Sequence, residues 1–535
     1  MRYLYKLFVA LTIMLTWTMF AVKANASVDV LDTIDIVCDS TIGTVGVSVA
    51  NSVVIVRVGA TLSLCDNAFV GNDVFSPHSL ILEDGAELLS MGNNVILNRV
   101  EVERFFPSHV PFLVAMPFDV DSIAIDSNVY AVKDTASYSS LVSMYDYDSE
   151  ARAAYNYQFN DKESTLWQRV SEMKSQLGLL VESNFDAVVR FIGSNYHEKQ
   201  GEQKSIVLKE YNYELWQDND KGKEPYFTSA ENMSWNLVGM PYLHTTNFDD
   251  MEYGRIIYKL SPFESRYKSI NTYDLSVSGS VPFGTAFFTQ TATLREYESV
   301  NIRARIGDVA PDVCSTSMLS LGIKAIDNTA DCADYISFSA VQASDASIHY
   351  NMAKDAVNMN PLDTSLVDIF FIRRGYHYSM LSDLNIESSV NVGIKIGKSG
   401  VYEIYLPDYV NPSAYEVVAL TDRYTGRVVD LKESAYSFPA DSEGELLDRF
   451  VITFRRSLPT AISGLVVYTH ERGVAVVAGL DLMMAYTIQV FDAKGMLITT
   501  RRVQDITASF HLPTDATYLI KVTSENTSSV LKVTL

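Results

Sequence analysis

Pairs of carboxylates are the residues of this sequence that come closest to a catalytic pattern. They occur at Asp146–Asp148, Asp218–Asp220 and Asp249–Asp250. Two carboxylates that face each other can serve as acid and base, or as acid and nucleophile, in glycoside hydrolysis. A chain with 65 Asp and Glu residues is nevertheless expected to have acidic loops without a catalytic role. Residues Asp218–Gly222 also begin like a calcium-binding loop, but the distal Glu of that pattern is missing.

The sequence contains none of the short motifs that carry enzyme chemistry at a fixed spacing. It lacks a GxSxG nucleophile elbow, an HExxH zinc motif, a P-loop and a Rossmann glycine motif. The eight histidines do not cluster in the sequence. A Ser–His–Asp triad is built from residues that are far apart in the chain, so the sequence neither nominates nor excludes one. We therefore predict no catalytic residue, no metal and no cofactor.

Exposed aromatic rings can stack on sugars, which makes the tryptophans candidate carbohydrate-binding residues. Trp235 lies in an apolar, strand-like segment, and Trp167 lies on the apolar side of a segment with helical spacing. Both patterns favour a place in the core. Only Trp216, within Tyr211–Asp220, has mostly polar neighbours.

The four cysteines form two pairs that are local in sequence, Cys38 with Cys65 and Cys314 with Cys332. Their spacing matches no zinc-binding pattern, and none of them lies in a CxxC motif. In an exported protein each pair can form a disulfide, and four buried thiols are the alternative. We predict the disulfides Cys38–Cys65 and Cys314–Cys332, each closing a loop of roughly 20–30 residues.

Charge and composition exclude several classes of protein. The chain has 535 residues, with 42 Lys and Arg against 65 Asp and Glu, and a formal net charge of −23. A nucleic-acid-binding protein needs an excess of basic residues. A disordered chain needs low hydrophobicity, whereas 47 % of these residues are hydrophobic. The composition therefore predicts an acidic, folded protein of several domains.

The first 26 residues have the pattern of a secretory signal peptide. Arg2 and Lys6 precede the apolar run Leu7–Phe20, and small residues end the segment at Ala26. A membrane anchor is the alternative, but a span needs about 20 apolar residues. We predict cleavage between Ala26 and Ser27. No later segment is apolar for long enough to span a bilayer, so we expect an exported chain that is soluble or attached to the cell surface.

Most of the sequence alternates between apolar and polar residues with a period of two, which is typical of β-strands. Examples are residues 52–58, 401–406 and 486–491, which are rich in Val, Ile and Tyr. The pattern predicts a mostly β protein.

One stretch has the spacing of an amphipathic helix. Trp167, Val170, Met173 and Leu177 follow one another at intervals of three or four residues. Ser164 and Thr165 precede them as possible caps. We predict one helix there.

Residues 27–104 contain a short internal repeat. Val56–Leu62 is echoed by Leu82–Leu88, and the glycines of the two copies, Gly59 and Gly85, are 26 residues apart. Such a period predicts a short β-solenoid that must lean on the segment that follows it. Two ordinary β-hairpins are the alternative.

The middle of the chain divides into two further parts. Residues 105–300 are predicted to form two related β-modules, because a buried strand runs into Met-Pro and an aromatic residue both at Pro111–Val120 and at Trp235–Tyr242. Residues 301–460 have short strands about every ten residues, which predicts a β-sandwich.

Several of these segments resemble a recurring type of surface protein of the Bacteroidetes. The similar segments are Ala115–Val120, Trp235–Tyr242 and Pro282–Phe288, although Met240 stands where that group usually has Asn. The resemblance implies an exported, β-rich architecture and carries no catalytic residue with it. Four short segments that precede the final domain also resemble that group. They have the patterns L-x-D, D-L, Y-x-F and R-F and lie at Leu420–Asp422, Asp430–Leu431, Tyr436–Phe438 and Arg449–Phe450.

Residues 461–535 resemble the C-terminal sorting domain of the type IX secretion system. The similar segments are Ile488–Leu497, Phe510–Pro513, Tyr518–Val522 and Val530–Leu535, although Thr517 stands where family members usually have Gly. The resemblance implies recognition by the type IX secretion machinery. The residues that carry the motif are Asp492, Gly495, Tyr518, Lys521 and Lys532.

The residues themselves also predict a fold for this segment. Asp492–Gly495 is a hairpin-turn sequence, and its flanking strands alternate apolar with polar residues. About seven short strands predict an Ig-like β-sandwich.

Two functions follow as expectations. The first is a non-enzymatic cell-surface or secreted protein for adhesion, scaffolding or binding of an extracellular glycan or protein ligand. The alternative is a secreted glycosidase or protease whose active site is assembled from distant loops.

Overall fold

The computed structural model describes most of the chain in segments separated by short gaps. The described residues are 31–42, 49–65, 74–91, 93–154, 166–199, 202–210, 230–251, 254–272, 277–291, 297–303, 308–310, 318–326, 333–341, 349–385, 387–408, 410, 412–456, 465–471, 473–480, 484–514, 516–524 and 528–535. The predicted cleavage point at Ala26 and Ser27, the pair Cys314 and Cys332, and Trp216 lie outside these residues.

The described chain is mostly β, as the alternating pattern predicts. The short helices α2 (Thr135–Tyr138) and α3 (Ser149–Ala154) accompany many strands arranged in several sheets. Among the described residues, no helix is both long enough and apolar enough to cross a membrane.

The helix predicted from the spacing around Trp167 is wrong. Trp167–Arg169 is the strand β13, Met173 forms a bridge with Val120, and Leu177 forms a bridge with Val238. The apolar residues of this stretch are spaced like one helix face, but they are buried or partly buried against different strands.

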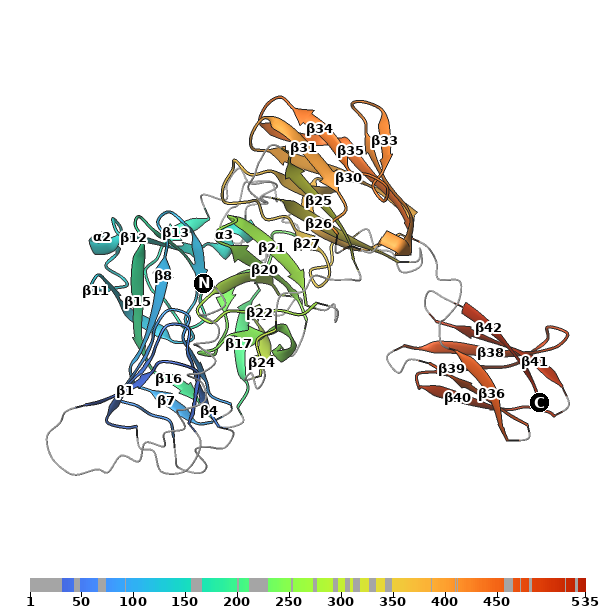
Figure 1. Ribbon diagram of the computed structural model, residues 1–535, viewed down its shortest axis with the longest axis horizontal. Helices are drawn as coiled ribbons and strands as arrows, with labels where there is room; N and C mark the ends of the chain where they lie inside the picture. Colours follow the sequence, from blue (N-terminus) through green and yellow to red (C-terminus); the bar gives the residue numbers. More distant parts are fainter. Residues whose placement is uncertain are drawn as a thin grey trace, which may run out of the picture.

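The N-terminal strands wind into a short parallel β-solenoid, drawn in blue in Figure 1. One face is formed by β1 (Asp32–Ile36), β3 (Ser52–Val56), β5 (Ser79–Leu82) and β8 (Val100–Phe106), and a second face by β2 (Ser40–Ile42), β4 (Thr61–Leu64) and β6 (Glu87–Leu89).

The sequence repeat sets the register of this solenoid. The two copies of the repeat stack on each other in register. Val56 pairs with Leu82, and Leu62 pairs with Leu88. Gly59 and Gly85 turn each rung with φ of +69° and +72°, a conformation that favours glycine. The strands of the two copies pair in parallel, whereas the strands of a β-hairpin are antiparallel. The solenoid prediction is therefore confirmed.

The first module extends the solenoid with antiparallel strands. Its sheet has the order β13-β12-β14-β9, while β15 pairs with both β8 and β10. The strands are β9 (Phe112–Val114), β10 (Asp119–Ile125), β11 (Asn128–Ala131), β12 (Val142–Tyr147), β14 (Leu179–Ser183) and β15 (Ala187–Ser194). β16 (Tyr196–Glu198) then pairs with β7 (Val95–Leu97) at the side of the solenoid.

The second module has the same strand order as the first. Its sheet runs β21-β20-β23-β18, and β17 pairs with β24 as β8 pairs with β15. In both modules the first strand of the sheet lies at an edge and leads into the Met-Pro segment. The elements are β17 (Lys204–Lys209), β18 (Trp235–Gly239), β19 (Thr246–Asn247), the 3₁₀ turn η3 (Phe248–Asp250), β20 (Ile256–Ser261), β21 (Arg266–Asn271), β22 (Ser280–Val281), β23 (Ala286–Gln290) and β24 (Tyr297–Ile302).

The two modules meet through matching contacts. The amide of Ala115, just after β9, donates to the carbonyl of Gly284 at 3.3 Å, and the amide of Gly239, at the end of β18, donates to the carbonyl of Gln176 at 2.9 Å. Gln176 and Gly284 both have positive φ, at +65° and +75°. The interface is therefore close to two-fold symmetric, although one chain supplies both halves.

The segment predicted as a β-sandwich, residues 301–460, is built from a single sheet over residues 319–456, which curls round on itself. Its order is β33-β32-β35-β30-β28-β29-β26-β25-β31-β34, with β27 added beside β29. The elements are β25 (Leu319–Ala325), β26 (Asp334–Val341), β27 (Ala356–Val357), β28 (Asp368–Arg373), β29 (Tyr376–Asn385), β30 (Glu387–Ile396), β31 (Gly400–Tyr405), the 3₁₀ turn η4 (Pro412–Ala414), β32 (Tyr415–Asp422), β33 (Arg427–Asp430), β34 (Tyr436–Ala440) and β35 (Gly444–Arg456).

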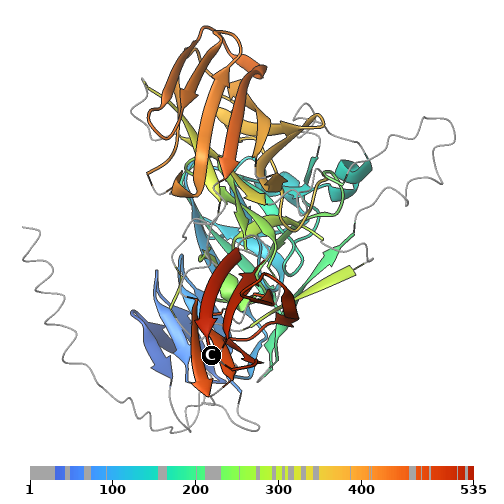
Figure 2. The same cartoon turned by 90° about the vertical axis from the view of Figure 1, so that its right-hand side faces the viewer.

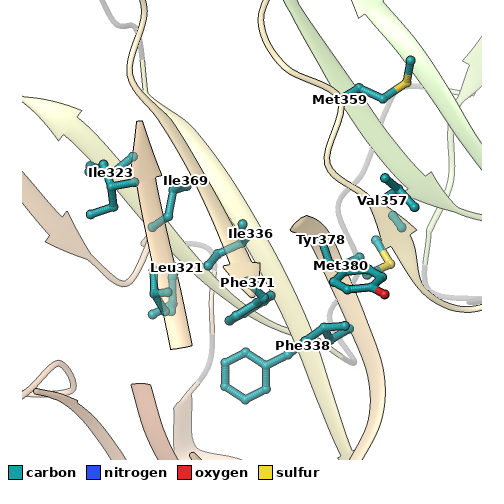
Figure 3. Close-up of a cluster of buried hydrophobic side chains, with 14 of the residues drawn as sticks. Leu321, Ile323, Ile336, Phe338, Val357, Met359, Ile369, Phe371, Tyr378 and Met380 are labelled. Carbon is teal, nitrogen blue, oxygen red and sulfur yellow. The ribbon is translucent and has the colours of Figure 1, made fainter. Parts of the chain in front are cut away.

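The inner surface of the curled sheet is packed with apolar side chains. Figure 3 shows them projecting from adjacent strands toward one another, with Phe338 of β26 and Phe371 of β28 in edge-to-face contact at 5.9 Å between ring centroids. The same core continues into the second module through Trp235 and Phe288.

The C-terminal residues form a separate seven-stranded sandwich, as predicted. One sheet has the order β36-β37-β40 and the other β39-β38-β41-β42. The strands are β36 (Val466–Glu471), β37 (Val474–Ala478), β38 (Tyr486–Asp492), β39 (Leu497–Val503), β40 (Thr507–His511), β41 (Thr517–Thr523) and β42 (Ser528–Thr534).

The hydrophobic cores show which parts of the chain act together. One core is shared by the solenoid and the first module, and the largest one joins parts of both modules to the curled sheet. The sandwich has a core made only of its own residues. Figure 2 shows the solenoid and the curled sheet at opposite ends of the body, with the modules between them.

Candidate functional site

The turn of the sorting-like motif forms as its sequence predicts. Asp492 and Gly495 lie in the hairpin between β38 and β39, where the Asp492 carboxylate accepts the amides of Lys494 and Met496, both at 2.9 Å. Gly495 has a φ of +83°, which lets the chain reverse. The two motif residues therefore build one tight turn.

The motif tyrosine is a structural residue of the sandwich. Tyr518 is buried, pairs in register with Asp492, and donates its hydroxyl to the carbonyl of Pro513 at 2.9 Å. Thr517, which stands in place of the usual Gly, contacts Thr534 of the last strand through the two hydroxyl groups at 3.0 Å. A threonine is compatible here because the position lies in a regular strand.

The two motif lysines lie on the outer face of the four-stranded sheet. Lys521 pairs in register with Val530, and Lys532 pairs with Leu519. Side chains alternate across a strand, and the neighbours Ile520, Val522 and Val533 point into the core. The lysines therefore face away from the core on adjacent strands.

The predicted disulfide between Cys38 and Cys65 is wrong, because both cysteines are free. The solenoid register explains why. Ser40 pairs with Leu62, which places Cys38 near the start of β4, whereas Cys65 follows its end and donates its amide to Ile42. The separation of about five strand residues is roughly 16 Å, and a disulfide needs Cα atoms within about 7 Å.

Of the two described tryptophans, Trp235 is a core residue and the half-buried Trp167 packs against the same core. Trp235 is fully buried, donates its indole N–H to the carbonyl of Glu231 at 2.8 Å, and is covered by the guanidinium of Arg152 at 4.0 Å. Trp167 packs edge-to-face on Tyr147 at 4.9 Å between ring centroids.

The named carboxylates that lie in the described part of the chain have separate local partners. The Asp148 carboxylate accepts a hydrogen bond from Gln168 at 2.6 Å, and Asp250 caps the η3 turn by accepting the amide of Asn247. The pair Asp218–Asp220 lies outside the described residues. In the described part of the chain, no group of three or more His, Cys, Asp and Glu side chains is placed to hold a metal.

Two carboxyl groups that the sequence did not single out meet where the second module joins the curled sheet. Asp334 and Asp368 are hydrogen bonded to each other, Asp368 is buried and Asp334 is partly buried, and Arg266 lies 3.5 Å from Asp334. Burial, followed by the charge of Asp334, raises the pKa of Asp368 well above its usual value. Asn358 donates to both oxygens of Asp368, at 3.2 and 3.0 Å. The Asp368 carboxyl group therefore keeps its proton to a higher pH than an ordinary carboxyl group does.

A partly buried lysine lies where the solenoid and the modules meet. The ammonium of Lys204 lies 3.6 Å from the ring centroid of Tyr196 and donates to the carbonyl of Pro241 at 3.2 Å. Glu198 accepts hydrogen bonds from Tyr196 at 3.0 Å and from Ser90. Burial lowers the pKa of Lys204 to about 8 and raises that of Glu198. These contacts bind three parts of the chain together.

Asp422, Tyr436 and Arg449, which belong to the L-x-D, Y-x-F and R-F segments, contact one another and close the curled sheet. We name these three residues the clasp. Arg449 donates to both oxygens of Asp422, at 3.1 and 2.9 Å, and Tyr436 donates to Asp422 at 2.7 Å. The same guanidinium lies 4.8 Å from the ring centroid of Phe438 and 4.9 Å from that of Phe450. The clasp therefore joins β32, β34 and β35, and its role here is structural.

The resemblances noted in the sequence have no counterpart in the comparisons with known proteins. No protein-family model matches this chain, and no curated protein matches it either.

Proposed function

We propose that this protein is exported and displayed on the cell surface, or released outside the cell, as a non-enzymatic β-rich protein for adhesion, scaffolding or ligand binding. In this proposal the C-terminal sandwich is its sorting domain, and the type IX secretion machinery is its partner during export. The main support is the independence of the sandwich, whose core contains only its own residues.

The positions of the motif residues give further support. Asp492 and Gly495 form a turn, Tyr518 anchors the interior, and Lys521 and Lys532 remain available on the surface. A domain that other proteins must recognise needs such a division between residues that hold the fold and residues that face a partner.

The body of the protein has features suited to a scaffold. Its parts are joined by buried polar contacts, such as the hydroxyl of Tyr378 donating to Glu231 at 2.5 Å and the amide of Val357 donating to the hydroxyl of Tyr258 at 3.0 Å. These bonds link the curled sheet to the second module, which favours a stiff body over one with hinged domains.

Export is tested by comparing the full chain with a variant that lacks residues 465–535, in a host with type IX secretion. We expect the full chain at the surface or in the medium, and the shortened chain in the periplasm. A fusion of residues 465–535 to a neutral periplasmic reporter should carry that reporter to the surface. Normal surface delivery of the shortened chain would refute the sorting role.

The same cultures test the signal peptide and the binding role. N-terminal sequencing of the exported protein should begin at Ser27, and a retained Met1 would rule out the signal. The purified exported protein, applied to an array of glycans and extracellular-matrix proteins, should bind one class of ligand in a saturable manner. Hydrolysis of an arrayed glycan or matrix protein would instead favour the secreted hydrolase.

A further inference from the structure

The C-terminal sandwich differs in charge from the rest of the chain. Residues 465–535 contain six Lys and Arg and six Asp and Glu, so their net charge is zero. Residues 27–464 contain 33 Lys and Arg against 59 Asp and Glu, a net charge of −26. Any acidic partner would therefore be repelled by the body of the protein but not by the sandwich.

Within the sandwich, basic residues are concentrated on one surface, which we name the outer face. The register of β39-β38-β41-β42 places three rows of side chains on it. Each row contains one cation. In the first row Arg502 lies opposite Thr487, and in the second Lys521 lies between Gln489 and Val530. In the third row Lys532 lies opposite Leu519, which is paired with Phe491. The outward residues of the four strands are Leu497, Thr500, Arg502, Thr487, Gln489, Phe491, Thr517, Leu519, Lys521, Thr523, Ser528, Val530, Lys532 and Thr534.

The outer face carries three positive charges that no described residue neutralises through an ion pair. None of its outward residues, all of them in the described part of the chain, has a carboxylate. Arg502, Lys521 and Lys532 form no ion pair with any described residue. Between the cations lie threonine hydroxyls and the side chains of Phe491, Leu519 and Val530, of which Val530 is 60 % exposed.

We propose that the outer face is the surface by which the sandwich is recognised, and that it docks on a carboxylate-rich surface of a protein of the export machinery. This inference rests on the proposed sorting role and adds the chemistry of the partner. Lys521 and Lys532 would each meet a carboxylate, while the threonines and apolar side chains between them exclude water. Electrostatic complementarity of this kind sets the choice of partner and the rate of encounter more than the final affinity.

An acidic protein fits the outer face better than an anionic membrane does. A juxtamembrane Lys or Arg contributes about 1 kcal/mol to binding at an anionic membrane, so three cations bind weakly by themselves. Phe491 and Leu519 are only partly exposed, and the more exposed Leu497 and Val530 are single side chains held in strands, so the face offers little that could insert deeply into a bilayer. A sheet that bears one cation in each of three rows instead matches a protein surface.

The test compares two charge-reversed forms of the full chain in a host with type IX secretion. Lys521→Glu with Lys532→Glu reverses the outer face. Lys494→Glu with Arg501→Glu changes the net charge equally at other sites, because Lys494 lies in the hairpin turn and Arg501 reaches toward the carbonyl of Ser509. We expect the first form to reach the surface about tenfold less than the second, with matching accumulation in the periplasm.

Three further measurements make the result decisive. Lys521→Arg with Lys532→Arg keeps the charge and should keep export. Thermal unfolding should give equal Tm values for both charge-reversed forms, because all four residues are on the surface. The wild-type protein should not float with phosphatidylglycerol vesicles, and flotation that is lost in the Lys521→Glu, Lys532→Glu form would overturn the proposal in favour of a lipid surface.

The outcomes also separate this inference from the proposed function. Equal export of both charge-reversed forms, together with retention of the chain that lacks residues 465–535, would overturn the outer face alone. Normal export of that shortened chain would overturn the sorting role and the outer face together.

Discussion

Ala115 and Gly239 occupy the same position in the two modules and face each other across the interface between them. Each follows a Leu-Val pair and precedes Met-Pro. A Cβ atom on residue 239 would lie far inside van der Waals contact with the Cβ of Ala115, and 3.1 Å from the carbonyl oxygen of Thr285. The two backbones can approach this closely because one of the two positions has no side chain.

The variant Gly239→Ala should therefore destabilise the body of the protein. We expect a loss of about 1–3 kcal/mol in the free energy of unfolding, since an added methyl group must displace packed backbone. Chemical denaturation followed by tryptophan fluorescence measures it, because Trp235 lies in the same strand. Gly400→Ala is the matched control, because a Cβ there meets no atom within 4 Å.

The exchanged pair Ala115→Gly with Gly239→Ala should recover part of that loss. The methyl group then moves from one strand to the other, and the interface again holds a single methyl group at this point. A double variant that is as unstable as the sum of the two single variants would show that the residues do not interact.

Asp422→Asn should weaken the clasp of the curled sheet in a manner that depends on pH. Burial by itself would raise the pKa of Asp422, but hydrogen bonds from Arg449 and Tyr436 outweigh it and lower the pKa to about 2. A carboxylate with a lowered pKa stabilises the fold above its unfolded pKa of about 3.9, and this stabilisation is lost as the pH falls toward 2. The wild type should exceed the variant by about 2–4 kcal/mol at pH 7, with a smaller gap at pH 3. Urea titrations at the two pH values measure the gap.

Asp368→Asn should show the opposite dependence. Because the pKa of Asp368 is raised, the wild-type pair is most stable below pH 4 and loses stability as the pH rises toward the folded pKa. An asparagine keeps a donor toward Asp334 and cannot ionise. The variant should therefore unfold at a higher temperature than the wild type at pH 9 and lose this advantage at pH 4. Differential scanning calorimetry at both pH values tests this, and an advantage independent of pH would contradict it.

Cys38→Ser should leave the stability of the exported protein unchanged, because Cys38 is exposed and not bonded to Cys65. Thermal unfolding should give the same Tm with and without a reductant for both the wild type and the variant. Peptide mapping without reduction should find no peptide in which Cys38 is joined to Cys65, and such a peptide would show that the solenoid rearranges in the oxidised protein.

Much of the fold could be predicted from local patterns. The alternation of apolar and polar residues predicts strands because a strand buries every second side chain. The similarity between Val56–Leu62 and Leu82–Leu88 predicts the solenoid, because stacked rungs need apolar residues and turns at matching positions. The turn at Asp492–Gly495 was predictable because its side-chain and backbone requirements are met within four residues.

Local patterns gave wrong predictions where side chains are covered by segments that are distant in the sequence. Trp167, Met173 and Leu177 have helical spacing, but each packs against a different part of the body, and no local rule contains that information. Cys38 and Cys65 are close in sequence, but the solenoid register keeps them apart along its strands. In a solenoid the stacking of the rungs decides which residues are neighbours, so two residues that are close in sequence need not be in contact.

The sequence by itself determined the class of the protein, its acidic charge, its repeat and the turn chemistry of its C-terminal sandwich, because these depend on composition and on neighbours within a few residues. The tertiary structure alone decided which side chains meet. It brought Asp334 to Asp368, Arg449 to Asp422, and Arg502, Lys521 and Lys532 onto one face free of carboxylates. The physical reason is that strand order and register are cooperative properties of whole sheets, and they place together residues that no local pattern connects.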